Sequence, residues 1–149
     1  MRRLDLPPVW LLLFALAVLV LSRLDPWSLR LEGAAVDLAA GLLIGGGALL
    51  VAVAVVQMRQ ARTAVLPRRE AAHLVTNGVF GRSRNPIYLG FVMLLLGWVL
   101  RLGSAPALAL VPLYAWVIER RFIRPEEEAL ARRFPQAFAR YREATRRWL

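Results

Sequence analysis

The residues best suited to chemistry lie close together in residues 73–90, where polar, charged, glycine and proline residues interrupt long apolar runs. Asn85 followed by Pro86 is typical of a helix start, because an Asn side chain can accept from a free backbone N–H and proline there loses no hydrogen bond. The free N–H groups of this helix start, beside Arg82 and Arg84, would favour an anionic group of a ligand. The stretch therefore predicts a water-facing anion site. The alternative is a basic loop that only leads into a well-capped membrane helix.

Further residues of this stretch suit a ligand site or limit its chemistry. Tyr88 lies one turn into the expected helix, and Gly78 and Gly81 allow positive-φ bends or a close backbone approach. His73 is the single histidine of the chain, and it could deprotonate an acceptor or be an ordinary loop residue. Because the chain has no cysteine and one histidine, it lacks the ligands of conventional zinc and iron–sulfur sites, and we expect no metal.

The elements that must position this stretch are apolar helices. Residues 9–21 carry no charge, and residues 38–58 form a second uncharged run of about the length, roughly 20 residues, that spans a bilayer. Two further apolar runs follow, each covering only about 21 Å as a helix, so they either cross with snorkelling arginine ends or form a short helical hairpin. We expect an all-α polytopic membrane protein, a single domain over residues 1–149, with about four transmembrane helices. The expected helices are residues 8–22, 34–58, 86–102 and 105–122, with a cytosolic loop at 59–85 and an amphipathic interfacial tail at 125–148.

A glycine-rich segment of the second helix predicts close helix packing. Gly41 and Gly45, followed by Gly46 and Gly47, offer a small-residue surface that another helix can approach. No strand pattern precedes the run, so it does not match a nucleotide-binding fingerprint. We expect these glycines to pack against a neighbouring helix.

The net charge of +10 comes from arginine, with no lysine, and its distribution indicates the orientation in a membrane. Residues 59–84 hold six arginines against one glutamate, and residues 119–149 hold nine arginines against five acids. The positive-inside rule places both segments and the N-terminus in the cytoplasm. Because the arginines are concentrated in the segments that flank the apolar runs, we expect a bilayer with anionic headgroups as a partner, and no nucleic acid.

The tail combines a cluster of acids with an apolar stripe. Pro125 is expected to start a helix whose first turn carries Glu126, Glu127 and Glu128, and Pro135 is expected to begin a second helix. At least one of the acids could face the arginines of the preceding loop. Residues at spacings of three and four form one stripe along both helices: Leu130, Phe134, Phe138, Tyr141, Thr145 and Trp148.

Separated motifs of this chain resemble one enzyme family, the isoprenylcysteine carboxyl methyltransferases and the related phospholipid N-methyltransferases. The segments that carry the resemblance are residues 78–80 (Gly-Val-Phe), residues 84–90 (Arg-Asn-Pro-Ile-Tyr-Leu-Gly), residues 126–130 (Glu-Glu-Glu-Ala-Leu), Phe134 and Tyr141. They stand in the order typical of the family, and the resemblance covers residues 73–148, about half the chain. It implies S-adenosylmethionine bound at the cytosolic membrane face, without a Rossmann domain, under a lid formed by the tail.

The resemblance also assigns roles to individual residues. The cofactor-binding residues that it implies are Arg84, Asn85, Tyr88, Gly90, Glu126, Glu127, His73 and Gly78. Among them, Arg84, Asn85 and His73 are the candidates for a catalytic role. A carboxylate can accept from ribose hydroxyls or from the methionine ammonium, and an arginine suits the methionine carboxylate.

The chain departs from the family pattern at two positions that matter for the site. Asn85 stands where a histidine is usual, and it keeps a hydrogen-bond donor but does not titrate near neutral pH. Ala144 stands where eukaryotic members place an arginine that holds the substrate carboxylate. The nearby arginines are Arg142, Arg146 and Arg147, of which Arg142 and Arg146 are our candidates for substrate binding.

The implied function is an S-adenosylmethionine-dependent methyltransferase of a bacterial inner membrane, multi-pass, with both termini in the cytosol. Its acceptor would be a small hydrophobic or lipid-linked molecule, methylated on a carboxyl, thiol or amine group. The alternatives are a phospholipid amine N-methyltransferase, an NADPH-dependent membrane reductase with a related helical core, and a non-catalytic membrane scaffold. The sequence leaves the acceptor atom and the oligomeric state open.

Overall fold

The computed structural model describes residues 5–24, 29–63 and 72–149, which form helices and no strand. The helices are α1 (Pro7–Leu24), α2 (Ala34–Gln60), α3 (Pro86–Leu102), α4 (Leu110–Ile118), α5 (Arg124–Arg133) and α6 (Pro135–Ala144). Short 3₁₀ turns cover Gly78–Gly81 and Pro106–Ala109, and a π-helical segment, Glu119–Ile123, joins α4 to α5. The predicted all-α class is confirmed for this part of the chain.

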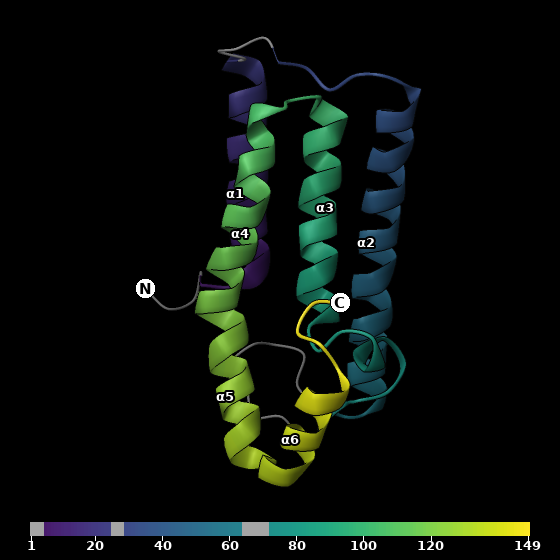
Figure 1. Ribbon diagram of the computed structural model, residues 1–149, viewed down its shortest axis with the longest axis vertical. Coiled ribbons are helices and arrows are strands. Elements are labelled where there is room, and N and C mark those ends of the chain that lie inside the picture. Colours follow the sequence, from purple (N-terminus) through teal and green to yellow (C-terminus); the bar gives the residue numbers. More distant parts are fainter. Residues whose placement is uncertain (1–4, 25–28, 64–71) are drawn as a thin grey trace.

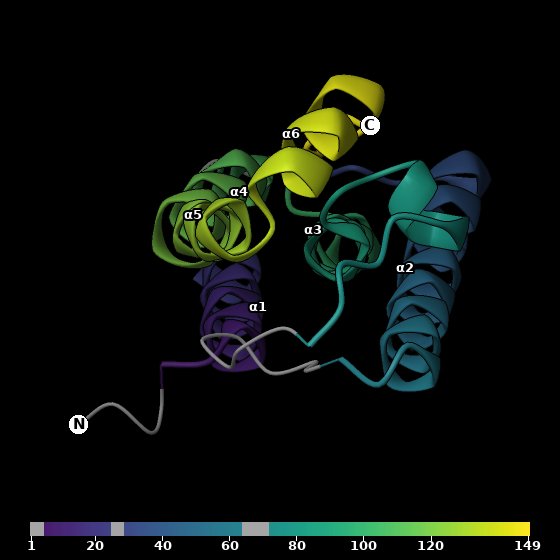
Figure 2. The ribbon, with the colours of Figure 1, turned by 90° about the horizontal axis from the view of Figure 1, so that it is seen from below.

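Helix α3 lies in the middle of the bundle. Seen from below, α1, α2 and the column formed by α4 and α5 surround it (Figure 2). Helix α5 extends beyond the ends of α2 and α3, and α6 turns back so that the C-terminal residues return to the start of α3 (Figure 1). The buried core accordingly gathers on α3, where its members are Tyr88, Phe91, Leu95 and Val99.

Helices α2 and α3 approach closely at glycines. A Cβ atom on Gly90 would lie 2.8 Å from the carbonyl oxygen of Gly47, and one on Gly46 would lie 3.3 Å from a methionine side chain of α3. A Cβ on Gly41 or Gly45 would meet no atom within 4 Å. The predicted packing surface is therefore right for Gly46 and Gly47 and wrong for the other two, because the helical period turns the two pairs to different faces.

Helix α3 begins and ends at the predicted residues. Pro86 is its first residue, where a missing N–H removes no intrahelical bond. Gly103 is its C-cap, and a left-handed φ of +67° there costs a glycine little. Helices α1 and α2 exceed the predicted bounds by one or two residues at some ends.

Among the described residues, two helices, α1 and α2, are long and apolar enough by length and composition to cross a membrane. This finding corrects the prediction of about four such helices. Helix α3 is apolar but has 17 residues, and the predicted fourth helix divides into a 3₁₀ turn, the nine residues of α4 and the π-helical segment. Pro106 and Pro112 remove backbone donors from the first turns of that stretch, which interrupts regular α-helix formation. The predicted cytosolic loop at 59–85 lies partly outside the described residues.

The outward faces of the bundle are apolar. Large apolar side chains are exposed on α1, α2 and α4: Leu12, Leu13, Leu16, Val20, Leu38, Leu42, Leu49, Val56, Leu113 and Trp116. An exposed apolar surface of this extent is unusual on a water-soluble protein. It fits contact with lipid.

The tail forms two helices that meet at Pro135, as predicted. Phe134 is the N-cap, with φ −129°, and Pro135 is the first residue of α6. Pro125 does not start a helix, which corrects the other prediction, because the chain is already helical through α4 and the five π-helical residues before α5. The changed hydrogen-bond spacing of a π turn accommodates a proline that would otherwise break an i→i−4 bond.

Candidate functional site

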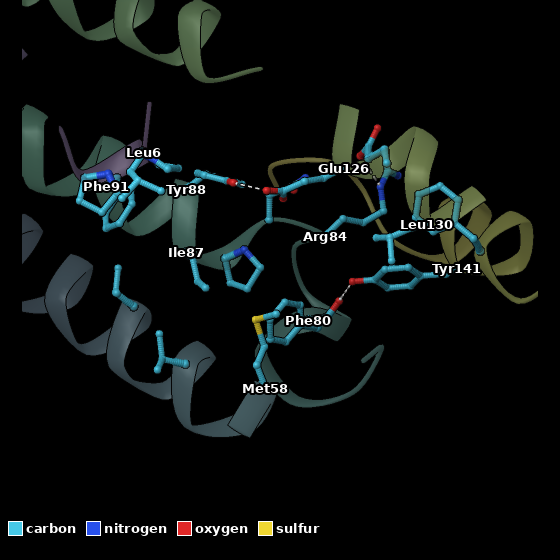
Figure 3. A pocket seen from close by; sticks show the side chains of 18 residues that line it. Leu6, Met58, Phe80, Arg84, Ile87, Tyr88, Phe91, Glu126, Leu130 and Tyr141 are labelled. Atoms are coloured by element: carbon cyan, nitrogen blue, oxygen red, sulfur yellow. Dashed lines mark hydrogen bonds and ion pairs between the residues drawn. The ribbon is translucent and has the colours of Figure 1, made fainter. Parts of the chain in front are cut away.

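A cavity of about 300 Å³ lies at the end of the bundle where the start of α3 meets the tail (Figure 3). This volume is at the lower end of the range of ligand pockets, about 300–1,000 Å³. The polar residues on its wall are Arg84, Asn85, Tyr88, Glu126, Glu127 and Tyr141. The rest of the wall is apolar: Leu6, Pro7, Pro8, Val51, Val55, Met58, Phe80, Pro86, Ile87, Phe91, Leu130 and Phe138. The polar residues of both sequence motifs therefore share one cavity.

Arg84 joins the residues before α3 to the tail. Its Nε donates to Glu127 Oε1 at 3.1 Å, and its Nη2 lies 3.0 Å from the same oxygen. Its Nη1 donates to the carbonyl oxygens of Thr145 at 2.6 Å and Arg142 at 3.4 Å, and its backbone N–H donates to that of Arg146 at 3.0 Å. The arginine that was predicted to face a ligand anion is thus held by an internal carboxylate.

Glu127 lies between two arginines. On the side away from Arg84, Arg147 Nη2 donates to Glu127 Oε2 at 2.7 Å. Burial alone would raise the pKa of the Glu127 carboxyl, but the hydrogen bond from Arg147 and the charge of Arg84 hold that pKa below its usual range. Arg147 also donates to Glu119 Oε1 at 3.0 Å, and the pKa of Glu119 is lowered too, first by its hydrogen bond from Arg124. Glu127 is therefore ionised at neutral pH.

Tyr88 and Glu126 meet on another part of the cavity wall. The Tyr88 hydroxyl donates to Glu126 Oε1 at 2.7 Å (Figure 3). Tyr88 comes from the first turn of α3 and Glu126 from the first turn of α5. Two of the three adjacent acids of the tail thus face the start of α3, whereas Glu128 is exposed.

Asn85 precedes α3, but its side chain makes no capping hydrogen bond, which corrects the predicted cap. Its Nδ2 instead donates to the carbonyl oxygen of Arg147 at 3.1 Å. The tail carbonyl binds the side-chain amide of Asn85, which therefore leaves the first free N–H groups of α3 uncapped. The predicted anion site beside two arginines is also incomplete, because Arg82 is exposed and only Arg84 reaches the cavity.

The tail covers the cavity with its predicted stripe. Phe138, Tyr141 and Thr145 of the stripe are buried. The Tyr141 hydroxyl donates to the carbonyl oxygen of Phe80, in the 3₁₀ turn Gly78–Gly81, at 2.6 Å (Figure 3). Burial raises the pKa of the Tyr141 phenol, so the group stays protonated and can donate. Helices α5 and α6 thus form a cover over the cavity.

Three residues that were predicted to bind a cofactor lie off the cavity wall. Gly90 is buried where α2 and α3 cross. Gly78 has the positive φ that the sequence suggested, +59°, at the start of its 3₁₀ turn. His73 is exposed, and its carbonyl oxygen accepts from Thr63 Oγ1 at 3.0 Å. A cofactor contact of these three residues therefore stays a prediction.

Arg142 and Arg146, the predicted substrate-binding residues, have exposed side chains. Their carbonyl oxygens, rather than their guanidinium groups, contact the site. Arg147 was noted beside them but not predicted to bind substrate, yet its side chain points inward to two carboxylates. Thr145 is extended, with φ −134° and ψ 132°. The chain leaves the helical conformation at Thr145, so the side chains of Arg146 and Arg147 no longer follow the helical period.

Sequence reasoning also missed much of the apolar wall. Residues 6–8, before and at the start of α1, line the cavity together with Val51, Val55 and Met58 of α2. The α2 positions have the i, i+4, i+7 spacing of a helical packing face. That spacing indicates a buried face but does not say what the face lines, and nothing local marks residues 6–8.

A family model described as phospholipid methyltransferase matches residues 36–137. The match includes both motifs, and therefore Arg84, Tyr88, Glu126 and Glu127. The chain belongs to the phospholipid methyltransferase family. An uncharacterized protein of Haemophilus influenzae strain Rd is 36% identical over 63 residues, which are 42% of this chain and 100% of that protein. No solved structure matches the chain.

Family membership confirms the resemblance that the sequence motifs carried, and it places the protein among methyltransferases. Together with the two long apolar helices, it indicates a membrane protein. Members of the phospholipid methyltransferase family generally use S-adenosylmethionine. Helix α1 and Arg147 lie outside the matched residues.

Proposed function

We propose that this protein is an integral-membrane, S-adenosylmethionine-dependent methyltransferase that acts on a small hydrophobic or lipid-linked acceptor at the cytosolic membrane face. The observation that carries the proposal is one cavity in which Arg84, Tyr88, Glu126 and Glu127, from two separate motifs, meet an apolar wall. Family membership supports the methyl transfer. The chemistry of the wall supports the choice of cofactor and acceptor class.

The donor set of the cavity fits the parts of S-adenosylmethionine. Arg84 carries a positive charge that suits the methionine carboxylate, and Glu126 and Glu127 can accept from the ammonium or the ribose hydroxyls. Phe80 and Phe138 offer aromatic surface to the adenine. Because Arg84 and Glu127 already hold each other, a charged ligand would share their hydrogen bonds rather than find empty partners.

The cofactor supplies an electrophilic methyl group on a sulfonium, so the chain has to orient the reactants more than move protons. Holding donor and acceptor in line can contribute up to about 7–11 kcal/mol. The tail covers the cavity with Phe138 and Tyr141, which limits access of water. We assign the orienting role to Arg84 and Asn85, which line the cavity, rather than to the exposed His73.

The acceptor class follows from the apolar wall contributed by residues 6–8 and by α2. Both α1 and α2 also carry exposed apolar side chains on their outer faces. A cavity with such walls favours an acyl or prenyl chain, or a small apolar molecule, over a polar one. We infer that the cavity faces the cytosol of a bacterial inner membrane because the described arginines at the end of α2, before α3 and in the tail lie at this end.

A phospholipid amine is the second candidate acceptor. The description of the matching family favours it, since that family is named for phospholipid methylation. Mass spectrometry of lipids from cells that express the protein distinguishes the two candidates. New N-methylated ethanolamine lipids would support the amine, and an unchanged ethanolamine lipid profile would favour a carboxyl or thiol acceptor.

The test of the cofactor is calorimetric titration of S-adenosylmethionine into the detergent-purified full chain. Wild type should bind, and Glu127→Gln should bind at least about tenfold more weakly, because a hydrogen bond to a charged group contributes about 1.5–3 kcal/mol. The matched control is Glu128→Gln, the same change at the exposed neighbour, which should bind like wild type. A folded wild-type protein that does not bind S-adenosylmethionine would contradict the proposal. This holds whether it binds NADPH instead or binds only anionic lipid vesicles.

A further inference from the structure

Arg147 is held through both its side chain and its main chain. Its guanidinium donates to Glu127 Oε2 at 2.7 Å and to Glu119 Oε1 at 3.0 Å. Its carbonyl oxygen accepts from Ser83 Oγ at 3.3 Å and from Asn85 Nδ2 at 3.1 Å. One residue thus links α5, the π-helical segment and the turn before α3.

Arg84 holds the same segment from the other side. Its N–H donates to the carbonyl oxygen of Arg146, and its Nη1 donates to that of Thr145. Glu127 accepts from Arg84 on Oε1 and from Arg147 on both oxygens. Charge-assisted bonds from two guanidinium groups fix the plane of the carboxylate, so its orientation at the cavity wall depends on both arginines.

We propose that Arg147 is a positioning residue for the cofactor site, which fixes the Glu127 carboxylate and holds residues 145–147 against residues 83–85, so that the tail stays closed over bound S-adenosylmethionine. This inference rests on the proposed function and extends it to a residue outside the family match at 36–137. Arg147 is not part of the cavity wall, so it acts through Glu127 rather than by touching the cofactor.

Loss of Arg147 changes the pH dependence of binding as well as the affinity. The charged or titratable groups around Glu127 are Arg84 from the turn before α3, Arg147 with Glu119 behind it, and Tyr141 from α6. In the wild type the pKa of Glu127 is held below its usual range, so binding persists as the pH falls. Without Arg147 that pKa rises, the carboxylate takes up a proton at higher pH, and binding is lost at higher pH.

The experiment is calorimetric binding of S-adenosylmethionine to the full chain over the acidic to neutral range. Arg147→Gln should weaken binding at least about tenfold at neutral pH. The pH below which binding is lost should also be higher than in the wild type. Arg147→Lys should lose binding at about the same low pH as the wild type, because it keeps the positive charge. Its affinity should be intermediate, because an ammonium group cannot span both carboxylates in the same way. Arg140→Gln, the same change at an exposed arginine of α6, should behave like wild type.

The outcomes separate a positioning role from a structural one. An equal loss of affinity at every pH, or an Arg147→Gln variant that binds like wild type, would overturn the proposal. Hydrogen exchange of the Arg84 amide, measured without ligand, tests the contact between residues 145–147 and residues 83–85 without any cofactor. If the wild type binds no S-adenosylmethionine but this contact is confirmed, only the proposed function fails. This amide donates to the carbonyl oxygen of Arg146, so it should exchange faster in Arg147→Gln than in Arg140→Gln, and equal exchange would contradict this contact.

Discussion

Arg84 and Glu127 stand 43 residues apart in the chain, and their side chains form an ion pair of 3.0 Å at the cavity wall. The two side chains are only 10% and 12% exposed, so water screens the pair little. A buried ion pair is weak evidence of stability in itself, because the desolvation of both charges opposes their attraction. Its consequence is geometric, since it brings the residues before α3 and the first turn of α5 into one site.

Arg84→Ala should destabilise the fold by about 1.5–3 kcal/mol, because Glu127 loses one of its two arginines and the tail carbonyls lose a charged donor. Thermal unfolding in detergent measures the change. Arg82→Ala is the matched control, since its side chain is exposed and the change should stay within about 0.5 kcal/mol. Equal unfolding midpoints for the two variants would show that the pair does not hold the tail.

Tyr88→Phe should destabilise the protein and Tyr114→Phe should not, although the chemical change is the same. Tyr88 loses a 2.7 Å hydrogen bond to Glu126, so we expect a loss of about 1 kcal/mol of stability and weaker binding of S-adenosylmethionine. The Tyr114 hydroxyl is buried with no hydrogen-bond partner among the described residues, so its removal should be neutral or stabilising. Thermal unfolding and calorimetry measure both variants. A Tyr88→Phe protein that matches wild type in both assays would remove this pair from the site.

Proline and glycine residues predicted those helix ends that depend only on the local backbone. Pro86, Gly103 and Pro135 mark helix ends because a missing N–H or a left-handed backbone acts within one turn. The motif residues Arg84 and Glu127 were singled out through the resemblance to one enzyme family, and both line the cavity. Both ends of α3 and the start of α6 could therefore be read from the sequence.

Features that depend on tertiary contact could not be predicted in the same way. Arg147 is one of nine arginines after residue 118, and only its contacts with Glu119 and Glu127 distinguish it. The π-helical segment Glu119–Ile123 has no local signature, so the proline after it was taken for a helix start. Residues 6–8 reach the cavity only because α1 packs beside α3.

Gly90→Ala should destabilise the protein because α2 leaves no room for a side chain. The added Cβ would lie 2.6 Å from Val51 Cγ2 and 2.8 Å from the carbonyl oxygen of Gly47, so backbone must shift. Overpacking of this kind costs about 1–3 kcal/mol. Gly45→Ala is the control on the same pair of helices: its Cβ meets open space, and the higher helix propensity of alanine should add about 0.5–1 kcal/mol. Thermal unfolding midpoints that move in the same direction for both variants would contradict this packing.

The last prediction concerns Asp5, which holds the start of α1 where residues 6–8 form part of the cavity wall. Its Oδ1 accepts from Arg121 Nε at 2.8 Å and from Trp10 Nε1 at 3.1 Å, and the Arg121 guanidinium lies 5.2 Å from the centre of the Trp10 ring. Asp5→Asn removes the ion pair and should loosen this wall.

Because residues 6–8 are apolar, we expect Asp5→Asn to raise the KM for a hydrophobic acceptor while leaving the affinity for S-adenosylmethionine nearly unchanged. Steady-state kinetics with varied acceptor, together with calorimetry of the cofactor, separates the two effects. The exchanged pair Asp5→Arg with Arg121→Asp should recover part of the wild-type KM, since it restores the ion pair in reverse. If Asp5→Asn weakens the cofactor and leaves the acceptor KM unchanged, this wall contacts the cofactor and the acceptor must bind elsewhere in the cavity.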